Sequence, residues 1–215
     1  DGVWFDEANN FAYPPKRNTA VIKQARDRGF WVVLNSDTAP TTLANFARDL
    51  GASPWVVAEN GGVIYVPNAG AWMLSQVANQ VDEIREETIA QLANQEPTPY
   101  LWLGDATPFI QRQEKIQGAN AGQTVYLVNT ARLASIGIYT RKVDTDGLLV
   151  VNDEITQRTE QLLLEILTSR GLNGALRCKR YPQIGSCLVK DLSVNKMRAV
   201  LRIIDQFGQN LSYWM

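Results

Sequence analysis

The stretch FWVVLNSDTAPTT, residues 30–42, joins an apolar run to a polar turn and then to the start of a helix. Residues 31–34 show no polar alternation, which is typical of a strand covered on both faces, as in a parallel sheet. Pro40 stands in the expected first turn of a helix, and one apolar helix face follows it: Leu43, Phe46, Ala47 and Leu50. Open α/β sheets bind ligands at such junctions, and helix N-termini attract anions. The stretch therefore predicts an α/β fold in which Ser36 holds a phosphate.

Further strand and helix patterns flank this junction. A helix is predicted at 18–28, closed by Gly29, and apolar strands are predicted at 55–58 and 63–66. Two apolar arms at 3–5 and 11–13 are typical of a hairpin flap. This βαβαβ order predicts a Rossmann-like doubly wound parallel sheet.

The pattern changes after Pro67. We expect a long helix over 71–94, and the elements that follow are strands at 124–128 and 134–140, a helix at 154–169, and strands at 175–180 and 186–189. This order predicts a small α+β domain at 68–189, inserted into a first domain formed by 1–67 and 190–215. A last helix, capped by Ser193 or Asn195, returns the chain to the first domain.

Composition excludes several functions. Lys and Arg number 21 against 22 Asp and Glu, and the basic residues do not cluster along the sequence, which argues against a nucleic-acid surface. No apolar run is long enough for a bilayer and no leader opens the chain, so we expect a cytoplasmic protein without a membrane partner. The absence of histidine excludes Ser-His-Asp and Cys-His catalytic sites. Catalysis would then rest on carboxylates, hydroxyls, lysine or a hard metal ion.

Two further pairs of residues leave alternatives open. Cys178 and Cys187 lie on predicted neighbouring strands, where two reduced buried thiols are favoured over a disulfide. Arg177 and Arg180 could bind a substrate carboxylate, but ordinary surface arginines are favoured.

Four short motifs, taken in order, resemble those of the haloacid dehalogenase-like phosphohydrolases that carry an inserted α/β cap of type C2. They are DGV at residues 1–3, Ser36 after the second strand, Asn60-Gly61 before the insertion, and Asn195-Lys196 at the last helix. The resemblance covers nearly the whole chain. Residues 59–67 are also similar to mannosyl-3-phosphoglycerate phosphatases, although Asp37 replaces their lysine. Phosphoglycolate and sucrose-phosphate phosphatases share the same cap class.

The resemblance implies a Mg²⁺-dependent phosphatase that acts on a small phosphorylated sugar or organic acid through an aspartyl-phosphate. It implies that Asp1 is the general acid and base and a Mg²⁺ ligand through its carbonyl. Ser36 and Lys196 would bind the transferring phosphoryl group, with Thr38, Asn60 and Gly61 as further substrate contacts. Plainer interpretations are a solvated Asp1, a helix cap at Ser36, a surface Lys196 and a simple Asn60-Gly61 turn.

The same resemblance places the nucleophile two residues before Asp1 and a late acidic loop just after Met215. We therefore expect the chain to be the interior of a longer protein, present as a monomer or homodimer. A catalytically inactive binding or assembly protein on this fold and a phosphomutase are the alternatives. Gly104-Asp105 resembles the late loop but lies inside the predicted insertion, so it is interpreted as a turn.

Overall fold

The computed structural model describes residues 16–111 and 115–207. Its contacts divide the chain into two units, one containing the residues up to Gln76 and from Ser193 onward, the other Val77–Leu192. Helices and β-sheets alternate along the chain, so the α/β class predicted from the sequence is confirmed. The sequence placed the insertion at 68–189, whereas residues 70–73 pair with a strand of the first unit.

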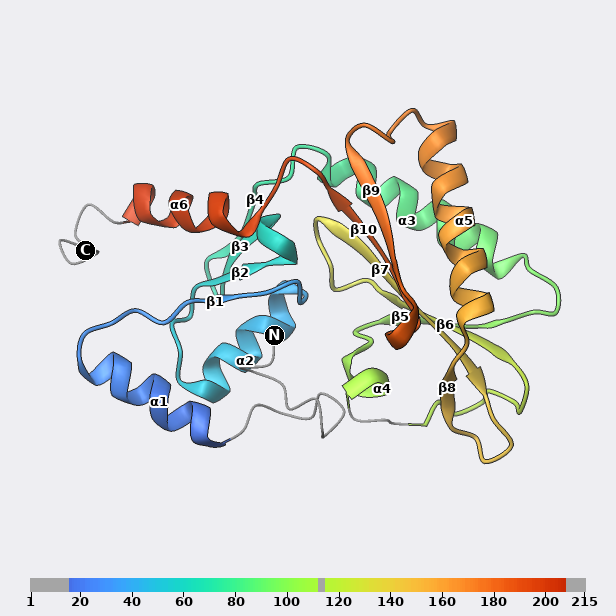
Figure 1. Ribbon diagram of the computed structural model, residues 1–215, viewed down its shortest axis with the longest axis horizontal. Coiled ribbons are helices and arrows are strands. Elements are labelled where there is room, and N and C mark those ends of the chain that lie inside the picture. Colours follow the sequence, from blue (N-terminus) through green and yellow to red (C-terminus); the bar gives the residue numbers. More distant parts are fainter. Residues whose placement is uncertain (1–15, 112–114, 208–215) are drawn as a thin grey trace. The chain divides into compact units, whose positions relative to one another are not determined.

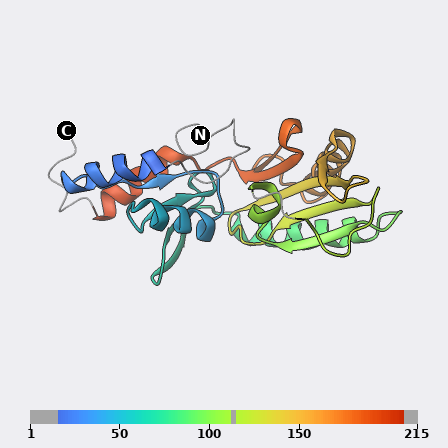
Figure 2. The same ribbon diagram turned by 90° about the horizontal axis from the view of Figure 1, so that it is seen from below.

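The first unit contains a four-stranded sheet in the order β1-β2-β3-β4. Its strands are β1 (Leu34–Asn35), β2 (Val56–Ala58), β3 (Val63–Val66) and β4 (Gly70–Met73). β1 and β2 run parallel, as a doubly wound sheet requires, while β3 and β4 form an antiparallel hairpin that projects from the unit (Figure 2).

Two predictions of local structure were wrong in this unit. Strand β1 begins at Leu34 rather than at residue 31, because only Leu34 and Asn35 pair with β2, and Trp31 is 44% exposed. Residues 71–73 form β4 rather than helix, and Trp72 of this strand stacks on Trp55 with ring centroids 5.4 Å apart. Hairpin pairing with the adjacent strand β3 and the stacking on Trp55 therefore override the helical pattern of these residues.

Helices cover both faces of the first sheet (Figure 1). They are α1 (Lys16–Asp27), α2 (Pro40–Leu50) and α6 (Lys196–Phe207). Val57 and Ile64 pack against Ala199 and Ile203 of α6, so the neighbouring residues of β2 face the side where α2 lies. The apolar face predicted for residues 40–50 is confirmed, since its four members are buried: Leu43, Phe46, Ala47 and Leu50.

The second unit is a six-stranded sheet in the order β5-β6-β7-β10-β9, with β8 paired to β7. Its strands are β5 (Tyr100–Gly104), β6 (Thr124–Asn129), β7 (Ser135–Val143), β8 (Leu149–Val151), β9 (Leu176–Tyr181) and β10 (Ser186–Asp191). The long helices α3 (Ala78–Ala93) and α5 (Asp153–Ser169) pack on one face of this sheet. The short helix α4 (Thr107–Gln111) packs on the other face through Phe109 and Ile110. Figure 1 shows both long helices beside the sheet.

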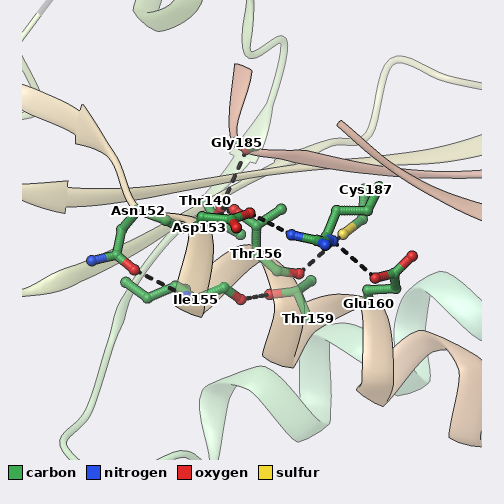
Figure 3. Close-up of polar contacts among 10 residues, drawn as sticks. Thr140, Asn152, Asp153, Ile155, Thr156, Thr159, Glu160, Gly185 and Cys187 are labelled. Carbon is green, nitrogen blue, oxygen red and sulfur yellow. Dashed lines mark hydrogen bonds and ion pairs between the residues drawn. The ribbon is translucent and has the colours of Figure 1, made fainter. Parts of the chain in front are cut away.

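A network of hydrogen bonds links the start of α5 to the sheet of the second unit (Figure 3). The Asn152 side chain accepts a 3.0 Å hydrogen bond from the Ile155 N–H and so caps the helix. One turn further on, the hydroxyls of Thr156 and Thr140 are 2.6 Å apart, and the Cys187 thiol donates to the Thr156 carbonyl at 3.4 Å. Cys187 and Cys178 are both free thiols.

No helix among residues 16–111 and 115–207 has the length and apolar character needed to cross a membrane.

Candidate functional site

Two hydroxyls meet at the carboxyl end of strand β1. The Ser36 N–H donates to the Val57 carbonyl at 2.9 Å, which carries the parallel pairing one residue beyond β1. The chain then turns, so that the Ser36 hydroxyl lies 3.0 Å from the Thr38 hydroxyl and accepts from the Thr38 N–H at 3.4 Å. Ser36 and Thr38 are both half-buried. This end of the sheet therefore presents two adjacent hydroxyl groups that share one hydrogen bond.

Helix α2 starts directly after these hydroxyls. Its N-cap is Ala39, which makes no side-chain cap hydrogen bond. The plainer interpretation of Ser36 as the helix cap is therefore wrong, because Ser36 lies before the N-cap residue. The positive end of the helix dipole favours an anion at this position.

The turn after strand β2 lies against the turn after β1. Glu59 and Asn60 have φ of 51° and 58°, a left-handed conformation that is uncommon for residues with a side chain. The Asn60 N–H donates to the Ser36 carbonyl at 3.2 Å, and the Glu59 N–H donates to the Thr38 carbonyl at 3.3 Å. Backbone hydrogen bonds thus offset the cost of an unfavourable local conformation.

A side-chain hydrogen bond also joins the two turns. The Asn60 amide donates to the Asp37 carboxylate at 2.7 Å, between two partly buried groups. Sequence reasoning treated Asp37 only as a departure from a related motif. Asp37 follows one parallel strand and Asn60 follows the neighbouring one, so both turns lie at the same edge of the sheet. These positions are the sequence signal that could have predicted the contact.

Gly61 allows the start of α6 to approach the same turn. A Cβ added to Gly61 would lie 2.3 Å from the Asn195 carbonyl oxygen and 2.9 Å from the Lys196 nitrogen, so no side chain fits there. Asn195 caps α6 by accepting from the Arg198 N–H at 2.9 Å, which decides between the two predicted caps. The Asn35 side-chain amide donates to the Lys196 carbonyl at 3.4 Å. The first residue of α6 is therefore fixed beside β1.

The structure brings five of the six predicted site residues to one edge of the first sheet. They are Ser36, Thr38, Asn60, Gly61 and Lys196. The Lys196 side chain is half-buried, and it forms no hydrogen bond or ion pair with any residue the structure describes. Asp1 lies outside the described residues.

The described residues do not by themselves form a metal site. Within 16–111 and 115–207, no group of three or more acidic, cysteine or histidine side chains is placed to hold an ion. Near the hydroxyls, the Asp37 carboxylate accepts a hydrogen bond from Asn60. The predicted magnesium ligand, Asp1, is outside the described part of the chain.

The remaining candidates lie in the second unit. Arg180 pairs with Glu160 at 3.0 Å and with Asp153 on the helix side, while Arg177 differs from it by an odd number of positions and so points to the opposite face of β9. The two side chains therefore do not form one carboxylate-binding pair, and the ion pairs of Arg180 are typical of the surface arginine that the sequence favoured. The turn predicted at Gly104-Asp105 leads into α4, where the Asp105 carboxylate accepts from the Thr107 N–H at 2.9 Å.

Comparison with known proteins gives one family match. The model of a family described as haloacid dehalogenase-like hydrolase matches residues 8–214. No curated protein sequence matches the chain.

Solved structures with the same fold are distant in sequence. A hypothetical protein from Geobacillus kaustophilus HTA426 is 12% identical with a TM-score of 0.56, over 97% of this chain and 73% of that one. Protein 0175 of Thermoplasma acidophilum is 14% identical with a TM-score of 0.53, over 96% and 67% of the two chains. The HAD subclass IIB sugar phosphatase BT4131 is 13% identical with a TM-score of 0.51, over 97% and 74%. At these identities the likeness shows a shared fold.

Proposed function

The chain belongs to the haloacid dehalogenase-like hydrolases, and from this membership we propose that it is a phosphatase for the monoester of a small phosphorylated sugar or organic acid. The observation that carries the proposal is the pair of hydroxyls at Ser36 and Thr38, 3.0 Å apart, at the carboxyl end of a parallel strand. They precede the start of α2. Hydroxyl donors and a helix N-terminus together suit a phosphoryl group.

Lys196 supplies the positive charge in this proposal. It is the first residue of α6, and its carbonyl accepts from Asn35, the residue before Ser36. Its ammonium has no carboxylate partner among the residues the structure describes, so it remains available to a phosphoryl oxygen. A cation at this position would stabilise the charge on the transferring group.

Asn60 and Gly61 position the site. The hydrogen bond from Asn60 to Asp37 holds the two turns together, and Gly61 lets the start of α6 come close to them. We propose that this arrangement keeps the hydroxyls and Lys196 in a fixed relation. Preorganised donors lower the reorganisation cost of binding a developing charge.

The family resemblance adds a metal and a carboxylate to the proposal. Enzymes of this family generally use Mg²⁺, which supplies charge neutralisation to phosphoryl oxygens when it is bound. Asp1, the general acid and base in this proposal, also serves as a metal ligand. By the same resemblance, the family's nucleophilic aspartate, a residue other than Asp1, would attack phosphorus and displace the alkoxide, which Asp1 would protonate. Water, deprotonated by Asp1, would then hydrolyse the aspartyl-phosphate and release phosphate.

Steady-state hydrolysis of p-nitrophenyl phosphate by the intact protein tests the proposal. We expect activity with Mg²⁺ that is lost in EDTA, and Ser36→Ala and Lys196→Ala should each lower kcat by about 100-fold. Ser169→Ala and Lys142→Gln, in the second unit, are matched controls and should leave kcat unchanged. Binding of phosphate without turnover would instead indicate a binding protein, and phosphoryl transfer to a second sugar would indicate a mutase. Full activity in Ser36→Ala would overturn the assigned site.

A further inference from the structure

A cavity of about 650 Å³ lies beside helix α2, and all the residues that line it belong to the first unit. Helix α2 contributes four of them at a spacing that places them on one face of the helix: Thr41, Ala44, Asn45 and Arg48. Pockets of roughly 300–1,000 Å³ hold small organic molecules. The cavity is therefore large enough for a metabolite.

Arg26, near the end of α1, brings one guanidinium to this cavity. Its Nη1 donates to the carbonyl of Gly51, the residue that caps the end of α2. The dipole of a helix stabilises a cation at its C-terminus, so this contact holds the guanidinium in place. A guanidinium has five N–H donors, and Arg26 forms no ion pair with a residue that the structure describes. Donors of Arg26 therefore remain for a ligand.

Arg48, in the last turn of α2, brings a second guanidinium. Its Nε pairs with the carboxylate of the adjacent Asp49 at 3.2 Å, and 72% of the arginine side chain is exposed. An exposed ion pair contributes little to stability, so a ligand can replace it at small cost. None of the described residues that line the cavity is acidic. Its walls therefore carry two positive charges and no negative one.

Strand β3 and the turn after it form the wall opposite α2. Ile64 packs against α6, so its neighbour Tyr65 faces the other side of the sheet, where α2 lies. Tyr65 is half-buried, and Pro67 and Asn68 line the cavity beside it. The Tyr65 hydroxyl and the Asn68 amide can donate hydrogen bonds, while Pro67 supplies apolar surface. A few polar groups in a partly apolar hollow are typical of small-ligand sites.

We propose that this cavity, the α2 cavity, binds a small organic anion that carries at least two carboxylate or phosphate groups. Arg26 and Arg48 would each hold one group, since a guanidinium can form two parallel hydrogen bonds with either kind. A role for Arg26 in joining α1 to α2 explains its hydrogen bond to Gly51, but it explains neither the hollow nor the second guanidinium. The proposal does not rest on the proposed phosphatase function.

Calorimetric titration of the full chain with citrate and with pyrophosphate, in metal-free buffer, tests the site. Citrate carries only carboxylates and pyrophosphate only phosphoryl groups, so the tighter of the two identifies the anionic group. We expect Arg26→Gln and Arg48→Gln each to weaken the tighter binding by about tenfold. Arg28→Gln is the matched control, because Arg28 is exposed and is not among the described residues that line the cavity. It should leave the affinity unchanged.

Two further variants test where the probe binds. Asn45 is exposed and lines the cavity, so the larger ring of Asn45→Phe should fill part of the hollow and weaken binding by about tenfold without a change in charge. Lys196→Ala should bind both probes as the unaltered protein does, because Lys196 belongs to the site at the hydroxyl pair. Circular dichroism checks that each variant is folded, and Arg48→Gln with Asn45→Phe still decides the matter if Arg26→Gln unfolds.

Absence of binding by both probes would overturn the site, as would an affinity that survives Arg48→Gln and Asn45→Phe. An equal loss in Arg28→Gln would show diffuse attraction between charges. A loss in Lys196→Ala would place the anion at the hydroxyl pair. Hydrolysis is not measured in these titrations, so a protein without phosphatase activity gives the same answer.

Discussion

The side-chain amide of Asn60 donates a 2.7 Å hydrogen bond to the carboxylate of Asp37, and this contact joins the turns that end two neighbouring parallel strands. Asn60 has a left-handed φ of 58°, and a residue in this conformation needs support from its surroundings. The contact also lies next to the hydroxyl pair of Ser36 and Thr38. This hydrogen bond therefore adds to the backbone hydrogen bonds that support the left-handed turn, and it does so beside the hydroxyl pair.

Replacement of Asp37 by Asn should lower the free energy of unfolding by about 1–2 kcal/mol, because the hydrogen bond to Asn60 loses its charged acceptor. Urea unfolding monitored by circular dichroism measures the change. Asp205→Asn is the control, since that carboxylate is 78% exposed and its distance to Arg202 is 4.0 Å. It should change stability by less than about 0.5 kcal/mol. An equal effect in both variants would show that the Asp37 contact does not support the turn.

The sequence predicted those parts of the fold that are set by neighbouring residues. Helix α2 follows from the spacing of its apolar residues and from Pro40, and the parallel pairing of β1 with β2 follows from two apolar runs joined by that helix. The family resemblance of their motifs grouped Ser36, Asn60 and Lys196 in one site, and the structure brings these three residues to one edge of the sheet. Local periodicity and turn chemistry carry this much information.

Features set by contacts between distant segments could not be predicted in this way. Residues 71–73 continue a helical pattern, yet they pair with β3 and stack Trp72 on Trp55. The hydrogen bond between Asp37 and Asn60 spans 23 positions and depends on how two turns meet. The opposite directions of Arg177 and Arg180, by contrast, follow from the two-residue period of a strand and were available in the sequence.

Replacement of Gly61 by Ala should destabilise the first unit by about 3 kcal/mol or more, because the new Cβ would overlap the Asn195 carbonyl. Gly70→Ala is a close control: its φ is +97° against +96° for Gly61, but no atom lies within 4 Å of its added Cβ. In both variants an alanine must adopt a left-handed backbone conformation, which costs about 1–2 kcal/mol. The difference between their unfolding free energies measures the overlap of the Gly61→Ala side chain with the Asn195 carbonyl. A difference near zero would show that the start of α6 does not pack closely against this turn.

The Cys187 thiol should resist alkylation in the folded protein at pH 8 to 9. A hydrogen bond with Cys178 and burial both raise the pKa of Cys187 above its usual value near 9.0, so the reactive thiolate is scarce. Because the unfolded thiol ionises first as the pH rises, this group stabilises the fold below about pH 9 and loses that contribution at higher pH. Mass spectrometry after iodoacetamide treatment measures the modification, with urea-unfolded protein as the fully reactive control. Rapid labelling of native Cys187 at pH 8 would contradict this assignment.

Replacement of Arg177 by Gln should stabilise the protein. The substitution removes the repulsion between Arg177 and Lys190, which lie directly opposite each other, and should raise the free energy of unfolding by about 0.3 kcal/mol at low salt. The gain should vanish near 1 M salt, where charges are screened over about 3 Å. Differential scanning calorimetry in a buffer without organic acids measures it, with Lys142→Gln as the control of equal charge. A loss of stability in Arg177→Gln, or a gain that persists unchanged near 1 M salt, would show that repulsion between Arg177 and Lys190 is not the cause.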